Sequence, residues 1–215
     1  PKLSYDATKD FAPITLISKV PSLYVVHPDL PVKNLKEFVA YAKARPGQVN
    51  AAIPSVTGQL VLEMLKQRGV PLFGVRFKGS ADAMTAVLGG HVPILIDTVA
   101  ATRTQLGRIK PLAVTTAGPM GSMPGVRTAS EQGLPSFTIA AWNALMVPRG
   151  VPAEIQQKLA AEMRKILDLP ETQKAMGDLG FERAPVMSQA ELTAWLREER
   201  RSYAQIIQTA QMKPD

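Results

Sequence analysis

The sequence predicts an α/β fold built around a mostly parallel sheet. The main observation is an alternation, between residues 49 and 116, of short β-branched apolar segments with short amphipathic segments. A second observation is that the apolar segments end at small or hydroxyl-bearing residues, which are typical of helix N-termini. Since strands that alternate with helices are joined by right-handed crossovers, we expect these strands to run parallel.

Before this alternation the chain has one long strand-like segment and one helix. FAPITLISKVPSLYVVH (residues 11–27) favours strands, and Pro13 and Pro21 predict an edge or a bend between two strand segments. Asn34 and Glu37 have the spacing of a capping box, so a helix is expected to start there. Its apolar face consists of Leu35, Phe38, Val39 and Ala42.

The alternation and the segments after it predict the remaining elements. Strands are expected at residues 49–53, 72–77, 92–97, 110–116, 137–147 and 181–186. Helices are expected at residues 59–68, 81–88 and 98–106, and after Pro152, Pro170 and Ser188. Ser188 and Glu191 form a second capping-box pattern. Residues 117–135 are rich in Gly, Pro and Ser and predict a loop.

Composition indicates a globular protein and excludes several kinds of site. Of the 215 residues, 46% are hydrophobic and 20% are charged, which suffices for a core. The net charge of +7 attracts anions, but the basic residues are scattered rather than gathered in a nucleic-acid patch. The absence of cysteine excludes disulfides, cysteine–metal sites and cysteine nucleophiles. No apolar run reaches the length of a membrane span, and no signal-peptide pattern opens the chain.

Motifs that would indicate an enzyme are absent from the sequence. It has no GxSxG, HExxH, Walker A or GxGxxG pattern, and its acidic residues lack EF-hand spacing. His27 and His91 lie at predicted strand ends, without a Ser or Cys at a suggestive spacing. We therefore expect a binding function without catalytic residues, metal or cofactor.

Three strand-to-helix turns form the candidate ligand site. In a parallel sheet these turns lie at the carboxyl edge, where open α/β sheets bind ligands. Each turn begins a helix whose first N–H groups have no partner within the helix, so it can hold a carboxylate or a phosphate. The candidate residues are Ser55, Val56, Thr57 and Gly58 in the first turn, Phe77, Lys78, Gly79, Ser80 and Ala81 in the second, and Asp97 and Thr98 in the third.

Each turn also has a purely structural explanation. Thr57, Ser80 and Thr98 are good N-caps, and Lys78 can be an ordinary solvated lysine. Asp97 can accept hydrogen bonds from an amine or from water, or it can cap the following helix. One anion–helix contact supplies only about 0.3–1 kcal/mol, so micromolar binding requires further groups that close over the ligand.

Five segments, taken in order along the chain, form a specific combination. They are YDATKDFAPITLISKVPSLYVVHPDLPVKNLKEFVAYAKARPGQVN, FKGSADAMTAVLGGHV, PLAVTT, MPGVRTASEQGLPSF and AAWNALMVPRGVPAEI. In this order they resemble the substrate-binding family of tripartite tricarboxylate transporters, the Bug-type periplasmic receptors. The resemblance covers essentially the whole chain.

The resemblance implies a two-lobed, Venus-flytrap fold of the type II periplasmic binding proteins, with parallel-rich sheets. Such receptors capture small organic acids or amino acids in the periplasm and deliver them to membrane transporter subunits. They bind ligands through backbone amides and ordered water at loops of both lobes. The implied ligand-binding residues are those of the three turns together with Trp142, for which a buried core position is the alternative.

The chain also departs from the family pattern. The strand, glycine-rich loop and further βα units that begin a family member have no counterpart here, so the first lobe is expected to be incomplete. Residues 20–141 should form the complete second lobe, and residues 1–19 and 142–215 a remnant of the first. The helices of the remnant would expose apolar side chains, which favours self-association and weak ligand binding. These side chains include Leu159, Trp195 and Ile206.

Two other functions stay open from the sequence. The ligand-sensing effector domain of a transcription regulator has the same two-lobed fold and requires a DNA-binding domain upstream. A hydrolase or lyase on an α/β sheet requires a base or a nucleophile, which the sequence does not place.

Overall fold

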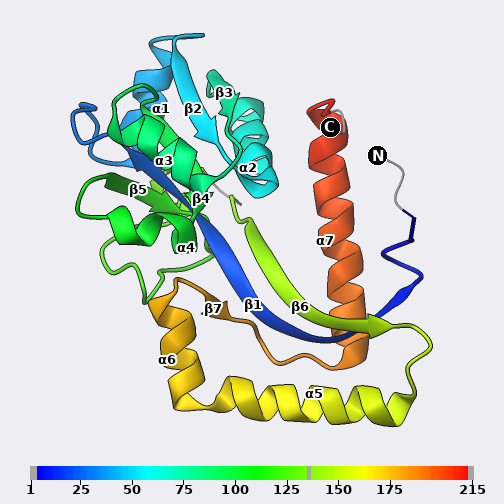
Figure 1. Cartoon of the computed structure of the whole chain (residues 1–215). Coiled ribbons are helices and arrows are strands. Elements are labelled where there is room, and N and C mark those ends of the chain that lie inside the picture. The colour runs from blue at the N-terminus through cyan, green and yellow to red at the C-terminus, as the bar shows by residue number, and fades with distance from the viewer. Residues whose placement is uncertain (1–3, 135–136, 213–215) are drawn as a thin grey trace. The chain divides into compact units, whose positions relative to one another are not determined.

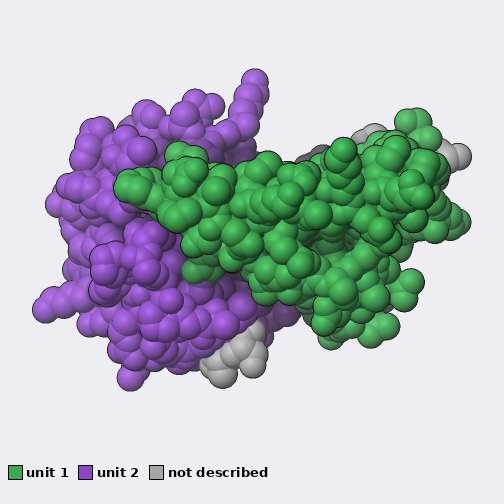
Figure 2. Space-filling model, turned by 90° about the horizontal axis from the view of Figure 1, so that it is seen from below, with its two compact units in different colours: residues 1–19, 142–215 green, residues 20–141 purple. Residues whose placement is uncertain are grey.

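The computed structural model describes residues 4–134 and 137–212, which form two compact units (Figure 1, Figure 2). Unit 1 comprises Pro1–Lys19 and Trp142–Asp215, and unit 2 comprises Val20–Ala141. Strands and helices alternate through unit 2, in agreement with the predicted α/β class. The assignment of unit 1 to an incomplete first lobe and of unit 2 to a complete second lobe stays a prediction.

Unit 2 is built on a sheet with the strand order β3-β2-β4-β1-β5. Its strands are β2 (Val49–Ile53), β3 (Leu72–Arg76), β4 (Ile94–Thr98), β5 (Lys110–Val114) and the second half of β1 (Phe11–Val26). Its helices are α1 (Leu35–Lys43), α2 (Val56–Gln67), α3 (Ser80–Leu88) and the short α4 (Val99–Thr102), with 3-10 turns at Arg103–Gln105 and Ser130–Gln132.

The sheet contains both parallel and antiparallel pairs. β2 runs parallel to β3 and to β4, so the carboxyl ends of these three strands lie at one edge, as the sequence predicts. β1 lies between β4 and β5 and runs antiparallel to both. The sheet, which was expected to be mostly parallel, therefore contains one strand of opposite direction, β1, the first strand in the sequence.

The prediction of two strand segments between residues 11 and 27 is wrong, because β1 is one strand of 16 residues. Its last residue paired with β7 is Lys19, and its first residue paired with β4 is Ser22. Pro21 lies between these two, where the strand changes partners. Proline, which has no N–H to donate, is typically found at such irregular positions of strands.

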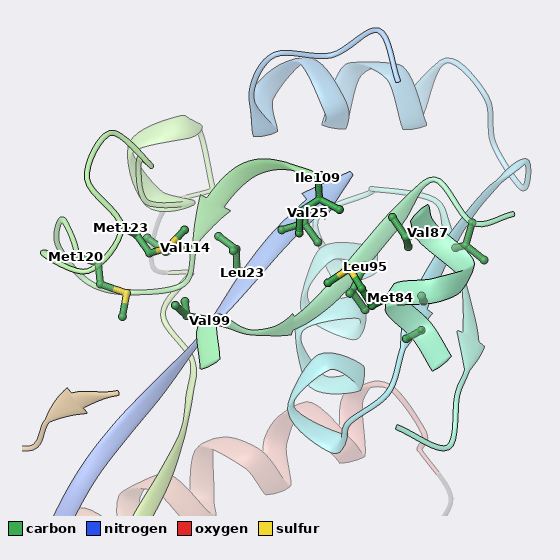
Figure 3. Close-up of a cluster of buried hydrophobic side chains, with 13 residues drawn as sticks. Leu23, Val25, Met84, Val87, Leu95, Val99, Ile109, Val114, Met120 and Met123 are labelled. Carbon is green, nitrogen blue, oxygen red and sulfur yellow. The ribbon is translucent and has the colours of Figure 1, made fainter. Parts of the chain in front are cut away.

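One hydrophobic core cluster of unit 2 lies where α3 covers the sheet (Figure 3). Met84 and Val87 of α3 pack there with Leu95 of β4 and with Leu23 of β1. Met120 and Met123, from the loop after β5, complete the same cluster. These methionines give the predicted loop 117–135 a packing role, because flexible thioether side chains fill irregular gaps.

Both predicted capping boxes mark the starts of helices. The Asn34 side chain accepts a hydrogen bond from the N–H of Glu37 at 2.9 Å, as expected for the N-cap of α1. Ser188 and Glu191 exchange side-chain and backbone hydrogen bonds at the start of α7, which confirms the second capping box. These local signals fix where α1 and α7 begin.

Unit 1 has three helices and only a small core. Its elements are the first half of β1, β6 (Ala140–Pro148), which begins in unit 2, β7 (Glu182–Arg183), α5 (Ala153–Asp168), α6 (Pro170–Asp178) and α7 (Gln189–Thr209). In unit 1, β6 and β7 both pair with β1, and α7 lies beside the β1–β6 pair (Figure 1). Leu167 is the one buried residue of α5 and Leu192 that of α7, whereas α2 in unit 2 buries six residues.

The small core of unit 1 makes one side chain unusually important. We expect Leu192→Ala to destabilise unit 1 by about 2–5 kcal/mol, because it removes the fully buried side chain that anchors α7 against Leu16 and Ala184. Hydrogen exchange of the α7 amides should accelerate while that of α2 stays unchanged. Ile207→Ala is the control, since Ile207 is 40% exposed, and it should leave both rates unchanged. Equal protection of α7 in the two variants would contradict this account.

Candidate functional site

The first predicted turn begins α2 and lies directly against β4. Ser55 is the N-cap of α2, and its hydroxyl accepts a hydrogen bond from the N–H of Gly58 at 3.1 Å. A Cβ at Gly58 would lie 2.6 Å from the carbonyl oxygen of Ile96. Only glycine therefore allows the first turn of α2 to approach the end of β4 this closely.

The second predicted turn begins α3 without a side-chain cap. Gly79 is the N-cap residue and has an extended backbone, but it offers no side chain to the first N–H groups of the helix. A Cβ added at Gly79 would meet nothing within 4 Å, so neither strain nor crowding requires glycine there. The first-turn N–H groups of α3 belong to Ser80, Ala81 and Asp82, and they have no partner within the helix itself.

The third predicted turn is closed by its own side chain. Thr98 is the N-cap of α4, and its hydroxyl accepts a hydrogen bond from the N–H of Ala101 at 3.2 Å. α4 contains only four residues before it tightens into a 3-10 turn, so the helix expected at 98–106 is much shorter than predicted. Such a short helix has a small dipole and contributes little to anion binding.

The sequence-based assignment of N-caps is therefore correct only for Thr98. Thr57 lies inside α2, because the helix already begins at Val56 behind Ser55. Ser80 is the first residue inside α3, and the preceding Gly79 takes the cap position. Because Gly79 and not Ser80 is the N-cap, capping does not explain Ser80, and the second turn becomes a stronger candidate for a ligand site.

Asp97 joins the second and third turns. Its side chain is only 2% exposed, and its Oδ1 accepts a hydrogen bond from the N–H of Thr98 at 2.7 Å. In the described part of the chain, Oδ2 is buried and has no hydrogen-bond partner. Burial raises the pKa of Asp97, while hydrogen bonding of its carboxyl group with the Ser80 hydroxyl and the Thr98 N–H partly opposes this shift. The proximity of Ser80 places the start of α3 beside the end of β4.

The remaining candidate residues of the turns differ in exposure. Lys78 and Ala81 are exposed, and Val56 is 74% exposed. Phe77 is partly buried and packs against the core cluster beneath α3. The exposure of Lys78 agrees with the alternative that it is an ordinary solvated lysine.

Trp142 lies in unit 1, whereas all residues of the three turns lie in unit 2. Its ring meets that of Trp195 edge to face, with centroids 5.6 Å apart, and it packs on the cluster around Leu192. Trp142 thus makes contacts that suit a core position, the alternative to a ligand-binding role. Its contribution to ligand binding stays a prediction.

A cavity of about 500 Å³ in unit 2 was not expected from the sequence. It lies at the start of α1 and is lined in part by Lys36, Arg127 and Gln132. The Gln132 Oε1 atom accepts the N–H of Leu35 at 2.7 Å, so a side chain of the protein already satisfies the start of this helix. No sequence pattern around Gln132 indicates this long-range contact.

Among residues 4–134 and 137–212, no group of three or more His, Cys, Asp or Glu side chains could hold a metal ion. In the same part of the chain, no helix combines the length and hydropathy required to cross a membrane.

The buried charge of Asp97 predicts a pH dependence of stability that Asp97→Asn should remove. Because the folded-state pKa of Asp97 lies above its usual value of 3.8, folding takes up a proton at pH values between the two. Relative to the variant, the wild type should lose stability as the pH rises through this window and regain it on acidification. Urea unfolding of both proteins from about pH 3.5 to about pH 7 measures this difference. A difference that stays constant with pH would contradict the prediction, and the exposed-site variant Asp82→Asn is the control.

Comparison with known proteins gives a consistent family assignment. Residues 1–212 match the family described as tripartite tricarboxylate transporter family receptor. A UPF0065 protein of Bordetella bronchiseptica is 33% identical over 99% of this chain and 64% of its own length. Protein BugT of Bordetella pertussis is 31% identical over 72% of this chain and 49% of its own. The chain thus spans about half to two-thirds of the length of these relatives.

Solved structures show the same relationship. R. palustris Rpa4515 with adipate superposes with a TM-score of 0.88 at 30% identity, covering 100% of this chain and 73% of that chain. MatC from Rhodopseudomonas palustris with bound malate gives 0.78 at 30% identity, covering 96% and 73%. The periplasmic binding protein BugD gives 0.83 at 27% identity, covering 98% and 73%. Together with the family match over nearly every residue, these similarities show that the chain belongs to the receptor family of the tripartite tricarboxylate transporters.

Proposed function

We propose that this protein is a receptor that captures a small carboxylate and delivers it to the membrane subunits of a tripartite tricarboxylate-type transporter. The observation that carries the proposal is the start of α3, where Gly79 leaves the first-turn N–H groups without a side-chain cap. These donors lie at the carboxyl edge of a parallel β3–β2–β4 ladder. Such an edge is the usual binding position of open α/β sheets.

The electrostatics of the chain favour an anionic ligand. The N-terminus of the nine-residue helix α3 carries a partial positive charge, and the net charge of the protein is +7. One helix end contributes only about 0.3–1 kcal/mol to the binding of an anion. We therefore propose weak binding by this chain, with dissociation constants nearer to millimolar than to micromolar.

The relatives support both the ligand class and the location. Two of the similar structures are described with adipate and with malate, and both compounds are small dicarboxylates. BugD is described as a periplasmic binding protein, and we place this receptor in the same compartment. The family description names a receptor, and the proposal includes no catalytic step.

The start of α3 gives a direct test of the proposal. Ser80→Pro should abolish or weaken carboxylate binding at least tenfold, because it deletes one first-turn N–H and places a proline ring beside the others. The fold should persist, because proline is favoured at the first position of a helix. Thermal-shift and ¹⁵N NMR titrations with a panel of small carboxylates, at concentrations up to about 10 mM, measure the effect.

Ala153→Pro is the matched control, because Ala153 is the first residue of α5 and is not a candidate site residue. In the control, the affinity for any carboxylate that binds the wild type should be unchanged. A folded Ser80→Pro variant with wild-type affinity would contradict the site assignment. A wild type that binds none of the carboxylates would contradict the proposed function.

We further propose that the protein self-associates through apolar side chains of unit 1. The prediction that Leu159, Trp195 and Ile206 are exposed is wrong, because all three are partly buried. Other apolar side chains are exposed instead: Ile155 and Ile166, on one face of α5, are 50% and 47% exposed, and Ile207 of α7 is 40% exposed. Apolar side chains that are exposed in this way favour association with a second copy.

Sedimentation velocity tests the association. The wild type should sediment as a dimer or larger species, and Ile155→Lys with Ile166→Lys should shift it toward monomer, because buried charges destabilise an apolar contact. Phe73→Lys is the control, since Phe73 is 63% exposed but lies in unit 2. A wild type that stays monomeric at high concentration would contradict this proposal.

A further inference from the structure

The Asp97 side chain occupies a position in β4 that would suit a core residue. Side chains two apart in a strand point to the same face of the sheet. Leu95, two residues before Asp97 in β4, belongs to the core cluster under α3 (Figure 3). Asp97 thus directs an ionisable group toward the α3 side of the sheet, near Ser80.

The second oxygen of this carboxyl group differs from the other buried polar atoms. Among the described residues, four buried side-chain oxygen or nitrogen atoms have no hydrogen-bond partner, and three of them are the neutral hydroxyls of Ser22, Tyr24 and Ser122. The fourth is Oδ2 of Asp97, whose partner oxygen Oδ1 is held by the N–H of Thr98. An unpaired buried carboxylate oxygen costs more than an unpaired hydroxyl, so a hydrogen-bond donor is expected to reach it.

The chemistry of the partner follows from the two kinds of group that meet here. An ionised carboxylate only accepts hydrogen bonds, so Oδ2 of Asp97 requires a donor. The first-turn N–H groups of α3 are donors and require an acceptor. Because Ser80 lies within hydrogen-bonding reach of the Asp97 carboxyl group, a ligand that satisfies both carries a hydroxyl or an ammonium group close to its carboxylate, as on the adjacent carbon.

We propose that Asp97 makes this receptor selective for carboxylates with a hydroxyl or ammonium group next to the carboxylate. The ligand carboxylate accepts hydrogen bonds from the start of α3, and the neighbouring donor binds Oδ2 of Asp97. A ligand carboxylate that lacks this donor leaves Oδ2 unpaired. A ligand that brings a second acceptor close to Oδ2 is repelled by the negative charge of Asp97. This inference rests on the proposed function, because it concerns the same site.

Matched ligand pairs test the selectivity. Each pair differs only by the group next to the carboxylate: succinate against malate and aspartate, and propionate against lactate and alanine. In ¹⁵N NMR titrations of the wild type, the hydroxy or amino member of at least one pair should bind about tenfold or more tightly than its partner, which is the usual size of a hydrogen bond to a charged group. The amide resonances of Ser80 and Ala81 should move in these titrations.

Asp97→Asn should remove this preference through a defined change in geometry. The Thr98 N–H holds the amide oxygen at the position of Oδ1, so the amide NH₂ group takes the position of Oδ2. A donor then replaces an acceptor, so the hydroxy and amino ligands should bind the variant no more tightly than succinate and propionate do. Asp82→Asn is the matched control, because Asp82 is an exposed acid in the first turn of the same helix. It should change the affinities of all ligands by the same factor.

The outcomes separate this inference from the function on which it rests. If the members of each pair bind the wild type equally, or if Asp97→Asn weakens every ligand to the same extent, the proposed role of Asp97 is wrong but carboxylate binding stands. Equal binding would mean that the Ser80 hydroxyl or a water molecule, and no ligand group, pairs with Oδ2. If no ligand of either kind shifts the resonances of Ser80 and Ala81, both the proposed function and this inference are contradicted. Thermal melting of each variant shows that the comparison is made between folded proteins.

Discussion

The antiparallel pairing of β1 with β4 and β5 holds unit 2 together. All residues from Val20 to Val26 are buried, and the register from Ser22–Thr98 to Val26–Ile94 fixes where β4 ends. Because side chains alternate along a strand, a slip of one residue in this register would move the Asp97 carboxyl group to the opposite face of the sheet. The closeness of Asp97 to the start of α3 therefore depends on the register of the whole second half of β1 against β4, and not only on Asp97 and Ser80.

In the described part of the chain, the candidate site contains N–H donors at the start of α3 that lack a side-chain cap. It also contains one acceptor, Oδ2 of Asp97, that lacks a hydrogen-bond partner. Gly79 leaves the first turn of α3 uncapped, while Ser55 and Thr98 cap α2 and α4 with their own hydroxyls. Three turns that look alike in the sequence thus differ in what they offer a ligand. The close approach of Gly58 to the Ile96 carbonyl oxygen suits a supporting role for the first turn, because it holds α2 against the strand that carries Asp97.

Features that depend on neighbours in the chain could be predicted from the sequence, and those that depend on distant contacts could not. The Asn34 N-cap and the Ser188 capping box are local, and the parallel β2, β3 and β4 follow from the alternation of strands and helices. The position of β1 between β4 and β5 depends on pairing across many residues, and no period in the sequence encodes it. The unpaired oxygen of Asp97 likewise depends on burial, which the residue types alone do not define.

The order of the strands in the sheet also affects how the chain can fold while it is being synthesised. Val26 of β1 pairs with Ile94 of β4 on one side and with Lys110 of β5 on the other, so β1 is made long before either of its partners. Until β4 and β5 leave the ribosome, the apolar segment around Tyr24 and Val25 has both edges unpaired. Such a strand is open to pairing with other chains, and contacts this distant in sequence slow folding. The second half of β1, an interior strand of the finished sheet, is therefore a segment at which pairing with other chains has to be avoided while the protein is being made.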